Sequence, residues 1–359
     1  MRKLICAALA GTLLCTALTG CGSQPVEEKD PIDYNQYVNA HGSMALTSEN
    51  CAFLQDMRLY TLDPDVSAPL APLCADENCT HSDPTCSAWL DALCIGAWED
   101  MIYYVAADNG GRIGLYCMDD QGRERRLVKE LTSLSDWNAN CSYQICCGVL
   151  AVNYWDAEDK RSVYVCSLDD DSQPECVFGA DEDEMSNDYI GLELREGWIF
   201  AYARAEGSDT LALWGMALTT GEKRLFDADV PLTARPALRG DSVVWYVAGE
   251  GAYSAPLDGS EPAKLFYASS SETEYGVFDD LYLYLIDPIA GNEMYVIDST
   301  GRTVQTIDED FLPYFLASTA DKVFFADAHT HDTRPQYWLD KTQLASGSAE
   351  VHKIEREFG

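Results

Sequence analysis

Three cysteines and a histidine lie close together near one end of the chain. They follow the pattern C-x4-C-x-H-x4-C, and they are Cys74, Cys79, His81 and Cys86. Thiolates and imidazoles are ligands that Zn²⁺ prefers, and four of them close a structural tetrahedral site. The spacing is wider than the usual C-x2-C pair, so a disulfide is an alternative, with Cys51 and Cys94 as rival partners, and free thiols are another. Zinc or a disulfide would make the segment a structural clasp, and zinc is the one cofactor that the sequence suggests.

A second candidate site is the histidine-containing stretch DAHTHD near the C-terminus. It places Asp327, His329 and His331 at alternate positions and ends at Asp332. In an extended chain, alternate side chains point to the same face. The first three residues could therefore bind a divalent metal or polarise a substrate. A solvated polar loop explains the same residues, and it is the interpretation that we favour at this stage.

Aromatic residues are a third source of binding groups, because the chain holds 8 tryptophans and 20 tyrosines. Most of them are expected in the core. Trp137 and Trp155 stand in polar surroundings, SLSDWNAN and NYWDAED. Their rings are candidates for exposed plates that stack on sugars or peptides.

No catalytic residue is singled out by a recognised motif. The sequence contains no G-x-S-x-G, H-E-x-x-H, P-loop or G-x-G-x-x-G pattern. It has only five histidines, and one of them, His41, lies in a polar stretch near the N-terminus. The motifs therefore give no reason to assign a reaction.

The N-terminus predicts export and lipid anchoring. A positively charged start precedes the apolar run Leu4–Leu18, which ends in LTGC at Cys21. These features describe a secretory signal, and the run is shorter than the roughly 20 residues of a membrane-spanning helix. The LTGC sequence resembles the lipobox of bacterial lipoproteins. That resemblance implies cleavage after residue 20 and a diacylglyceryl group on Cys21, which would anchor the protein to the cell membrane outside the cytoplasm.

Charge restricts the partners of the exported chain. The formal net charge is −36, and such a surface repels nucleic-acid phosphates and anionic headgroups. Nucleic acid is therefore excluded as a partner, and membrane contact is expected only through the lipid anchor. The chain is expected to be a monomer. Residues 21–43 are polar and without periodicity, so they are interpreted as a flexible tether.

The rest of the chain, residues 44–359, repeats and is interpreted as one domain. A turn followed by a β-branched or aromatic strand recurs every 39 to 49 residues, starting at Asp56, Asp100, Gly148, Gly197, Asp241, Asp280 and Asp321. Repeats of this length with four short strands are typical of β-propeller blades. The sequence therefore predicts an all-β propeller, with seven blades favoured and six or eight as alternatives. The first unit is degenerate, and we expect its MALTS strand (residues 44–48) to close the ring beside Val351–Ile354.

The cysteine segment also carries a family resemblance. It contains Pro-Leu-Cys at residues 72–74, Cys-Thr-His at 79–81 and Cys86. This pattern resembles a segment of the TolB-like and DUF5050-type propeller lipoproteins of gut Firmicutes. The resemblance covers most of residues 44–355, and it implies a propeller fold and an extracytoplasmic location rather than an activity.

Together these patterns favour a non-catalytic binding or scaffolding propeller at the cell surface, with a protein, peptide or glycan ligand. One alternative is a glycan hydrolase or lyase that uses the central funnel with His329 or His331. Another is an envelope-assembly protein that recruits partners as TolB does. The residues lining the funnel discriminate between these functions: convergent carboxylates, histidine and arginine favour an enzyme, whereas apolar or small residues favour a scaffold.

Overall fold

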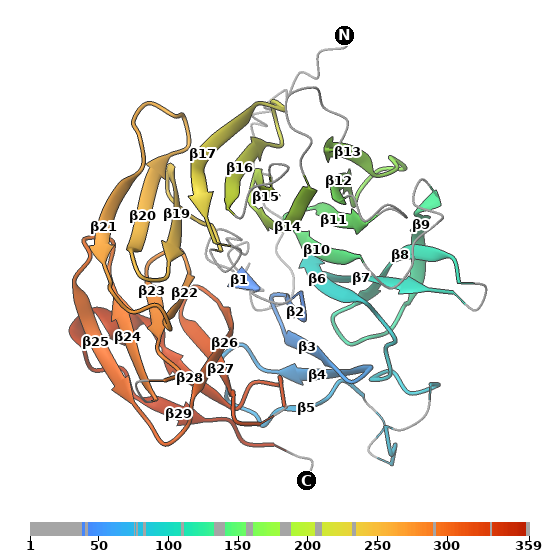
Figure 1. The fold of residues 1–359 in the computed structure, drawn as a ribbon. Coiled ribbons are helices and arrows are strands. Elements are labelled where there is room, and N and C mark those ends of the chain that lie inside the picture. The colour runs from blue at the N-terminus through green and yellow to red at the C-terminus, as the bar shows by residue number, and fades with distance from the viewer. Residues whose placement is uncertain are drawn as a thin grey trace, which may run out of the picture. The chain divides into compact units, whose positions relative to one another are not determined.

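The structure is a computed structural model, and β-strands make up most of it (Figure 1). It divides into two units, Met1–Pro31 and Ile32–Gly359, and every described residue belongs to the second. No helix among these residues has the length and apolar character needed to cross a membrane. The described residues are 38–39, 42–74, 76, 78–81, 84–108, 111–132, 141–155, 161–179, 188–204, 210–231, 235–289, 292–330 and 332–356.

The strands of the second unit form seven antiparallel sheets around a central axis, which confirms the predicted seven-bladed propeller (Figure 1). Blade 1 contains β2 (Met44–Leu46), β3 (Cys51–Gln55), β4 (Arg58–Leu62) and β5 (Ala71–Pro72). Blade 2 contains β6 (Cys94–Trp98), β7 (Met101–Ala107), β8 (Ile113–Asp119) and β9 (Arg126–Glu130). Blade 3 contains β10 (Ser142–Cys146), β11 (Val149–Trp155), β12 (Arg161–Ser167) and β13 (Glu175–Phe178).

The remaining blades follow the same order, from an innermost first strand to an outermost last strand. Blade 4 contains β14 (Asp188–Arg195), β15 (Trp198–Arg204), β16 (Leu211–Ala217) and β17 (Lys223–Val230). Blade 5 contains β18 (Ala237–Arg239), β19 (Ser242–Val247), β20 (Gly251–Pro256) and β21 (Lys264–Ala268). Blade 6 contains β22 (Tyr275–Phe278), β23 (Leu283–Ile286), β24 (Glu293–Ile297) and β25 (Thr303–Asp308). Blade 7 contains β26 (Pro313–Ser318), β27 (Lys322–Asp327), β28 (Tyr337–Asp340), the 3-10 helix η3 (Lys341–Ser346) and β29 (Val351–Lys353).

The first predicted repeat begins one strand later in its blade than the other six. Six of the seven predicted turns precede the second strand of a blade, but Asp56 precedes β4, the third strand of blade 1. Asp56 and Met57 both have positive φ, 50° and 58°, as a tight two-residue hairpin requires. The same pair of positive φ angles occurs in the turn between the first and second strands of blade 2, at Glu99 and Asp100. One turn signal therefore marks two different positions in a blade.

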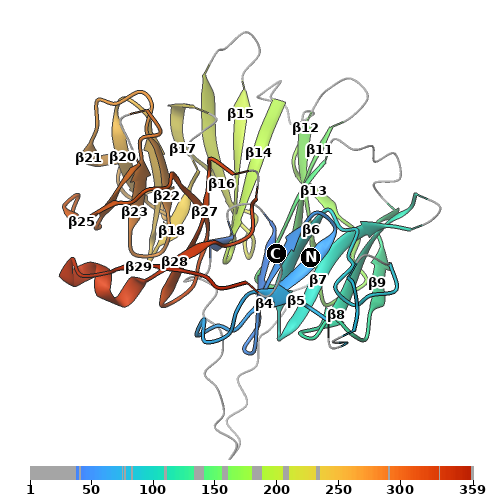
Figure 2. The ribbon, with the colours of Figure 1, turned by 90° about the horizontal axis from the view of Figure 1, so that it is seen from below.

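The core lies between the blades. Seven clusters of buried side chains are found among the described residues, and each joins two neighbouring sheets. The ring of Tyr284 in blade 6, for example, lies 5.4 Å from that of Phe315 in blade 7. Phe53 of blade 1 meets Phe324 of blade 7 at 5.9 Å, edge to face. The junction between the first and last blades is thus packed like the others, and Figure 2 shows the blades of this ring from the side.

Ring closure differs from the prediction. The MALTS segment does not pair as a strand with the last blade, because Met44–Leu46 pairs with β3 in its own sheet and meets the last blade only through buried side chains. A strand further upstream, β1 (Val38–Asn39), instead pairs with β26 at the inner edge of blade 7. At the periphery, the Leu70 N–H donates to the carbonyl of Glu355 at 2.8 Å. Closure therefore occurs on both sides of the last sheet.

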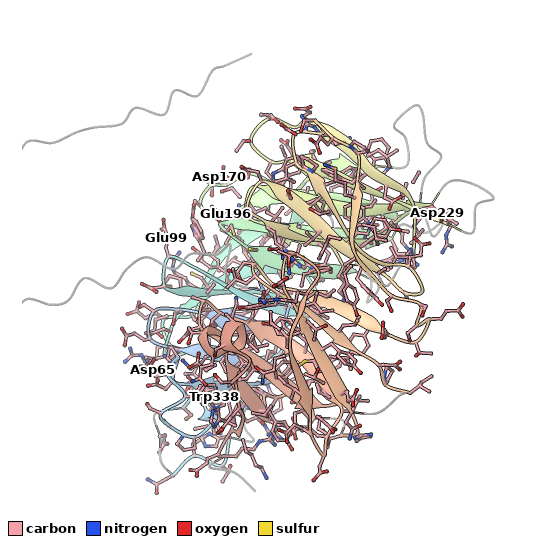
Figure 3. The ribbon with its side chains drawn as sticks, turned by 90° about the vertical axis from the view of Figure 1, so that its left-hand side faces the viewer. Asp65, Glu99, Asp170, Glu196, Asp229 and Trp338 are labelled. Carbon is pink, nitrogen blue, oxygen red and sulfur yellow. The ribbon has the colours of Figure 1, made fainter. Side chains whose placement is uncertain are left out.

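Acidic side chains are spread over several blades. Asp65, Glu99, Asp170, Glu196 and Asp229 are all exposed, and Figure 3 shows their positions around the ring. Distributing like charges over separate blades limits their mutual repulsion, since exposed charges more than about 10 Å apart are largely screened at physiological salt.

Candidate functional site

The cysteine segment begins and ends on one strand. The Leu73 N–H donates to the carbonyl of Leu59 in β4 at 2.9 Å, and the Leu59 N–H donates to the carbonyl of Ala88 at 2.7 Å. The Leu90 N–H then donates to the carbonyl of Met57 at 2.9 Å. The chain thus leaves the outer edge of blade 1 after β5 and returns to the same edge. These bonds fix the two ends of an intervening loop close together.

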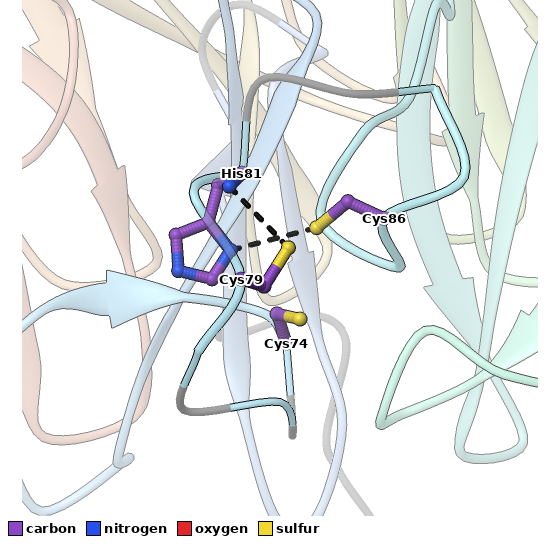
Figure 4. A group of neighbouring side chains, drawn as sticks. All are labelled: Cys74, Cys79, His81 and Cys86. Carbon is purple, nitrogen blue, oxygen red and sulfur yellow. Dashed lines mark hydrogen bonds between the residues drawn. The ribbon is translucent and has the colours of Figure 1, made fainter.

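All four predicted ligands meet within this loop. Cys74 follows the first fixed end and Cys86 precedes the second, while Cys79 and His81 come from the loop between them (Figure 4). Their ligand atoms all lie within 4.8 Å of one another. The His81 Nδ1 atom is 3.5 Å from the Cys86 Sγ atom. No disulfide joins these cysteines among the described residues. The structure therefore brings together every member of this set.

Backbone amides lie close to two of the sulfur atoms, and burial changes the pKa of two of the thiols. The Ala88 N–H lies 3.3 Å from the Cys86 sulfur, and the His81 N–H lies 3.3 Å from the Cys79 sulfur. Burial raises the pKa of Cys86 to about 11, against the effect of the Ala88 amide. Burial also acts upward on the pKa of Cys74, but hydrogen bonds, led by that with Ser87, outweigh it and the net shift is downward.

Blade 2 holds the returning end of the segment. Arg125, between β8 and β9, donates from Nη1 to the carbonyl of Trp89 at 2.8 Å and from Nη2 to the carbonyl of Ser87. The Ser87 hydroxyl donates in turn to the carbonyl of Leu73 at 3.0 Å. One guanidinium from blade 2 thus binds a segment paired to blade 1, so the loop connects the outer parts of these two blades.

The second candidate, DAHTHD, does not form a shared metal set among the described residues. The Asp327 carboxylate accepts from the backbone and from Nδ1 of His329, at 3.0 and 3.1 Å. The His329 side chain is 60% exposed. His331 lies outside the described residues. Asp327 ends β27 and a turn follows at Ala328 and His329, so the alternation of an extended strand stops at Asp327.

Asp332 binds two arginine side chains. Its carboxylate accepts from Nε and Nη2 of Arg334, each at 2.9 Å, and from Nη1 of Arg356 at 2.7 Å. The Arg334 guanidinium lies 4.9 Å from the ring centre of Tyr60 in blade 1. Asp332 therefore holds two arginines at the junction of the first and last blades. Although burial opposes the shift, these hydrogen bonds lower the pKa of Asp332 to about 2.

Stability should depend on pH through this residue. The pKa of Asp332 is lower in the folded state than its ordinary value of 3.8. Its stabilising contribution is therefore complete above about pH 4 and is lost as the pH falls towards 2. We expect Asp332→Asn to cost about 1–2 kcal/mol at neutral pH, after screening by solvent, and to cost nothing at the acid limit. Urea unfolding of parent and variant across pH 2–7 measures this difference. Exposed Asp241, changed to Asn, is the control, and an Asp332 effect independent of pH would contradict the prediction.

The remaining predicted site residues lie elsewhere. Trp155 ends β11 and is half-buried, and the guanidinium of Arg161 lies 4.6 Å from its ring centre. One part of this ring is therefore already covered by the protein. Trp137 and the lipid-attachment residue Cys21 are outside the described residues.

Two clusters of titratable side chains were not predicted from the sequence. Cys146 and Cys147 place their sulfur atoms 2.9 Å apart at a hairpin, and the interaction between them lowers the pKa of Cys146 and raises that of Cys147. The second cluster contains Lys341, which is 1% exposed and pairs with the buried Asp279 and the partly buried Asp280. Adjacent cysteines were a visible signal for the first cluster. The second had none, because its partners are far apart in the chain.

Comparison with known proteins supports the fold. No family model matches the chain, and no curated protein matches it. Among solved structures, that of a prolyl endopeptidase matches with a TM-score of 0.57 at 13% identity, over 88% of this chain and 50% of the endopeptidase chain. PorZ, a surface component of the type-IX secretion system of Porphyromonas gingivalis, matches with a TM-score of 0.52 at 12% identity, over 90% of this chain and 40% of PorZ. The propeller domain of the Trilobed protease from Pyrococcus furiosus matches with a TM-score of 0.51 at 14% identity, over 73% of this chain and 84% of that domain.

These matches show a shared propeller fold and nothing finer. The chain spans half or less of the first two matched proteins. BamB from Moraxella catarrhalis and TolB from Acinetobacter baumannii also match, at TM-scores of 0.47 and 0.40, values too low to carry an argument. The propeller fold that the TolB-like resemblance implies is confirmed by the seven sheets of the structure itself, and the DUF5050 resemblance stays a prediction.

Proposed function

We propose that this chain is a lipid-anchored, extracytoplasmic propeller that binds a protein, peptide or glycan partner without altering it chemically. The observation that carries the proposal is the composition of the innermost strands. Most of them are apolar or small: β2 is MAL, β6 is CIGAW, β18 is ALR, β22 is YGVF and β26 is PYFLAS. The funnel walls of a propeller enzyme need convergent acid, base or charge-stabilising groups instead.

Polar side chains of two further innermost strands, β10 and β14, have partners within the protein. Gln144 of β10 donates to the carbonyl of Leu192 at 3.1 Å and accepts from the Leu194 N–H at 2.7 Å. Glu193, which is 6% exposed, pairs with Arg195 at 3.2 Å. These contacts join blade 3 to blade 4 and stabilise blade 4 itself. Groups with such partners support a structural role for the inner strands.

The guanidinium of Arg239 gives a further example. It lies 5.2 Å from the ring centre of Phe278 and 5.7 Å from that of Phe266. Cations placed over aromatic faces are stabilised by the ring quadrupole. Arg239 therefore supports the contact between blades 5 and 6, and the innermost strands favour binding at loops over chemistry in the funnel.

Two further considerations support placement at a surface. The LTGC sequence at Cys21 has the pattern of a lipid-attachment signal, and two acyl chains give stable membrane anchoring. PorZ, whose propeller fold this chain shares, is described as a bacterial surface component. We extend only the location to this chain and leave its partner to experiment.

The test has an anchoring arm and a binding arm. In the first, cells carry the parent chain or Cys21→Ala, and fatty-acid labelling with membrane fractionation follows the protein. We expect label and membrane association to be lost in the variant, because the thioether forms only at this sulfur. A Cys176→Ala chain is the matched control, since it removes a cysteine far from the signal. Retention of the label in Cys21→Ala would show that the anchoring proposal is wrong.

The binding arm uses the full chain, purified in detergent, on glycan and peptide arrays and in cross-linking to envelope proteins. We expect saturable binding of a ligand that is recovered unchanged. The same assays with His329→Ala address the enzyme alternative, because His329 is exposed and is the histidine of the DAHTHD segment that lies among the described residues. Ligand cleavage by the parent that disappears in His329→Ala would overturn the proposal in favour of a hydrolase or lyase.

A further inference from the structure

We infer that Cys74, Cys79, His81 and Cys86 form a closed, structural zinc site that fixes the loop joining blades 1 and 2. This inference is independent of the proposed function, because it depends only on the geometry of the loop. Three sulfurs and one imidazole within 4.8 Å of one another form a Cys₃His set, one of the common structural zinc sets. Zinc–sulfur bonds of about 2.3 Å place tetrahedral ligand atoms about 3.8 Å apart, so a small contraction suffices.

The direction of the histidine distinguishes a metal from a disulfide. A disulfide would join two of the three cysteines and give the imidazole no role. In the structure, the Nδ1 atom of His81 lies 3.5 Å from the Cys86 sulfur (Figure 4). An imidazole nitrogen directed at a thiol cluster is the arrangement that a mixed nitrogen and sulfur metal site requires.

Hydrogen bonds around the cluster also suit metal-bound thiolates. The backbone amides of His81 and Ala88 are directed at the sulfurs of Cys79 and Cys86, each at 3.3 Å. Such outer contacts orient metal ligands and stabilise the negative charge that a thiolate retains on the metal. The cluster therefore has both a ligand set and a shell that supports it.

The site is structural because it is closed and peripheral. Four protein ligands fill a tetrahedral zinc ion and leave no position for a substrate. The loop follows the outer edge of β4, away from the funnel, and both of its ends are fixed by hydrogen bonds to Leu59. A metal there would hold Cys79 and His81 against strand ends that are already fixed. Its role is to order the loop and not to perform chemistry.

Metal analysis and thermal unfolding of the full chain, purified in detergent, test this inference. We expect about one zinc ion per chain, bound by all four side chains. A chelator should remove it and lower the melting temperature, and added zinc should restore both, because metal binding is coupled to folding. Cobalt substitution should give the ligand-field spectrum of a tetrahedral thiolate site.

Variants locate the metal. Cys79→Ala and His81→Ala should each lose most of the bound zinc, whereas Cys176→Ala, at an exposed cysteine outside the cluster, should keep it. If the first two variants fold poorly, native mass spectrometry of the parent with and without chelator still reports the metal. Two outcomes overturn the inference: a parent chain without stoichiometric metal whose melting temperature responds to reductant, as a disulfide would, or zinc retained in both cluster variants.

Discussion

Replacing Lys341 by methionine is expected to lower the free energy of unfolding by about 3–5 kcal/mol, as removing one partner of a buried ion pair does. The Lys341 ammonium lies 3.1 Å from Asp279, and the two side chains are 1% and 0% exposed. It also donates to Asp280 and, at 3.2 Å, to the carbonyl of Thr319. Methionine fills similar space but leaves the buried Asp279 carboxylate and the partly buried Asp280 carboxylate without their cation.

The loss in the free energy of unfolding caused by Lys341→Met should be smaller at acid pH than at neutral pH. Burial and then Asp279 raise the pKa of Asp280, while Lys341 opposes both effects. Without the lysine, the pKa of Asp280 rises further. A carboxyl with a raised folded pKa destabilises the fold above that pKa, and the penalty declines as falling pH protonates it. Urea unfolding of the variant at neutral and acid pH measures the change.

An exposed lysine provides the control for this experiment. Lys264 pairs with Glu261 within blade 5, and its side chain is 67% exposed. Surface ion pairs of this kind contribute little to stability. Lys264→Met should therefore unfold close to the parent. Equal losses in the two lysine variants, or no loss in Lys341→Met, would show that the buried network does not join blades 6 and 7 as described.

The propeller could be predicted because its signals are local. Each strand has its own β-branched and aromatic run, and each hairpin has its own turn residues, so seven repeats stand out along the chain. The same locality produced the two errors. The tight turn at Asp56–Met57 looks like a turn before a second strand, and nothing in the two residues Val38–Asn39 indicates that they close the ring.

The candidate sites show where sequence reasoning stops. Four ligands within one short segment can be predicted from spacing alone, because a short loop limits how far they can separate. At Asp327 the residues suit both a polar loop, which is the interpretation favoured from the sequence, and an extended chain, and the structure has a turn at Ala328 and His329. The partners of Lys341 and Asp332 could not be predicted, because Asp280 and Arg356 are 61 and 24 residues away from them. Such pairs are set by tertiary packing, between blades 6 and 7 for Lys341 and within blade 7 for Asp332 and Arg356, which no local pattern records.

Gly301 should be much less replaceable than Gly221, although both end hairpin turns with similar backbone angles. Their φ values are +81° and +72°. A Cβ atom at Gly301 would lie 2.0 Å from the carbonyl oxygen of Phe266 in blade 5, whereas one at Gly221 would meet nothing within 4 Å. Alanine in this left-handed region costs about 1–2 kcal/mol at either position. At Gly301 the backbone must also move, which adds about 1–3 kcal/mol of overpacking strain.

The Gly301→Ala and Gly221→Ala variants therefore separate backbone strain from contact between blades. We expect Gly301→Ala to lose about 2–5 kcal/mol and Gly221→Ala about 1–2 kcal/mol. Urea unfolding followed by tryptophan fluorescence compares them, and Gly301→Ala should also expose the outer edge of blade 5 to hydrogen exchange around Phe266. The shared φ makes Gly221 the reference for conformational cost alone. Equal losses would mean that the carbonyl of Phe266 yields freely, so that β21 is not held firmly against the hairpin of blade 6.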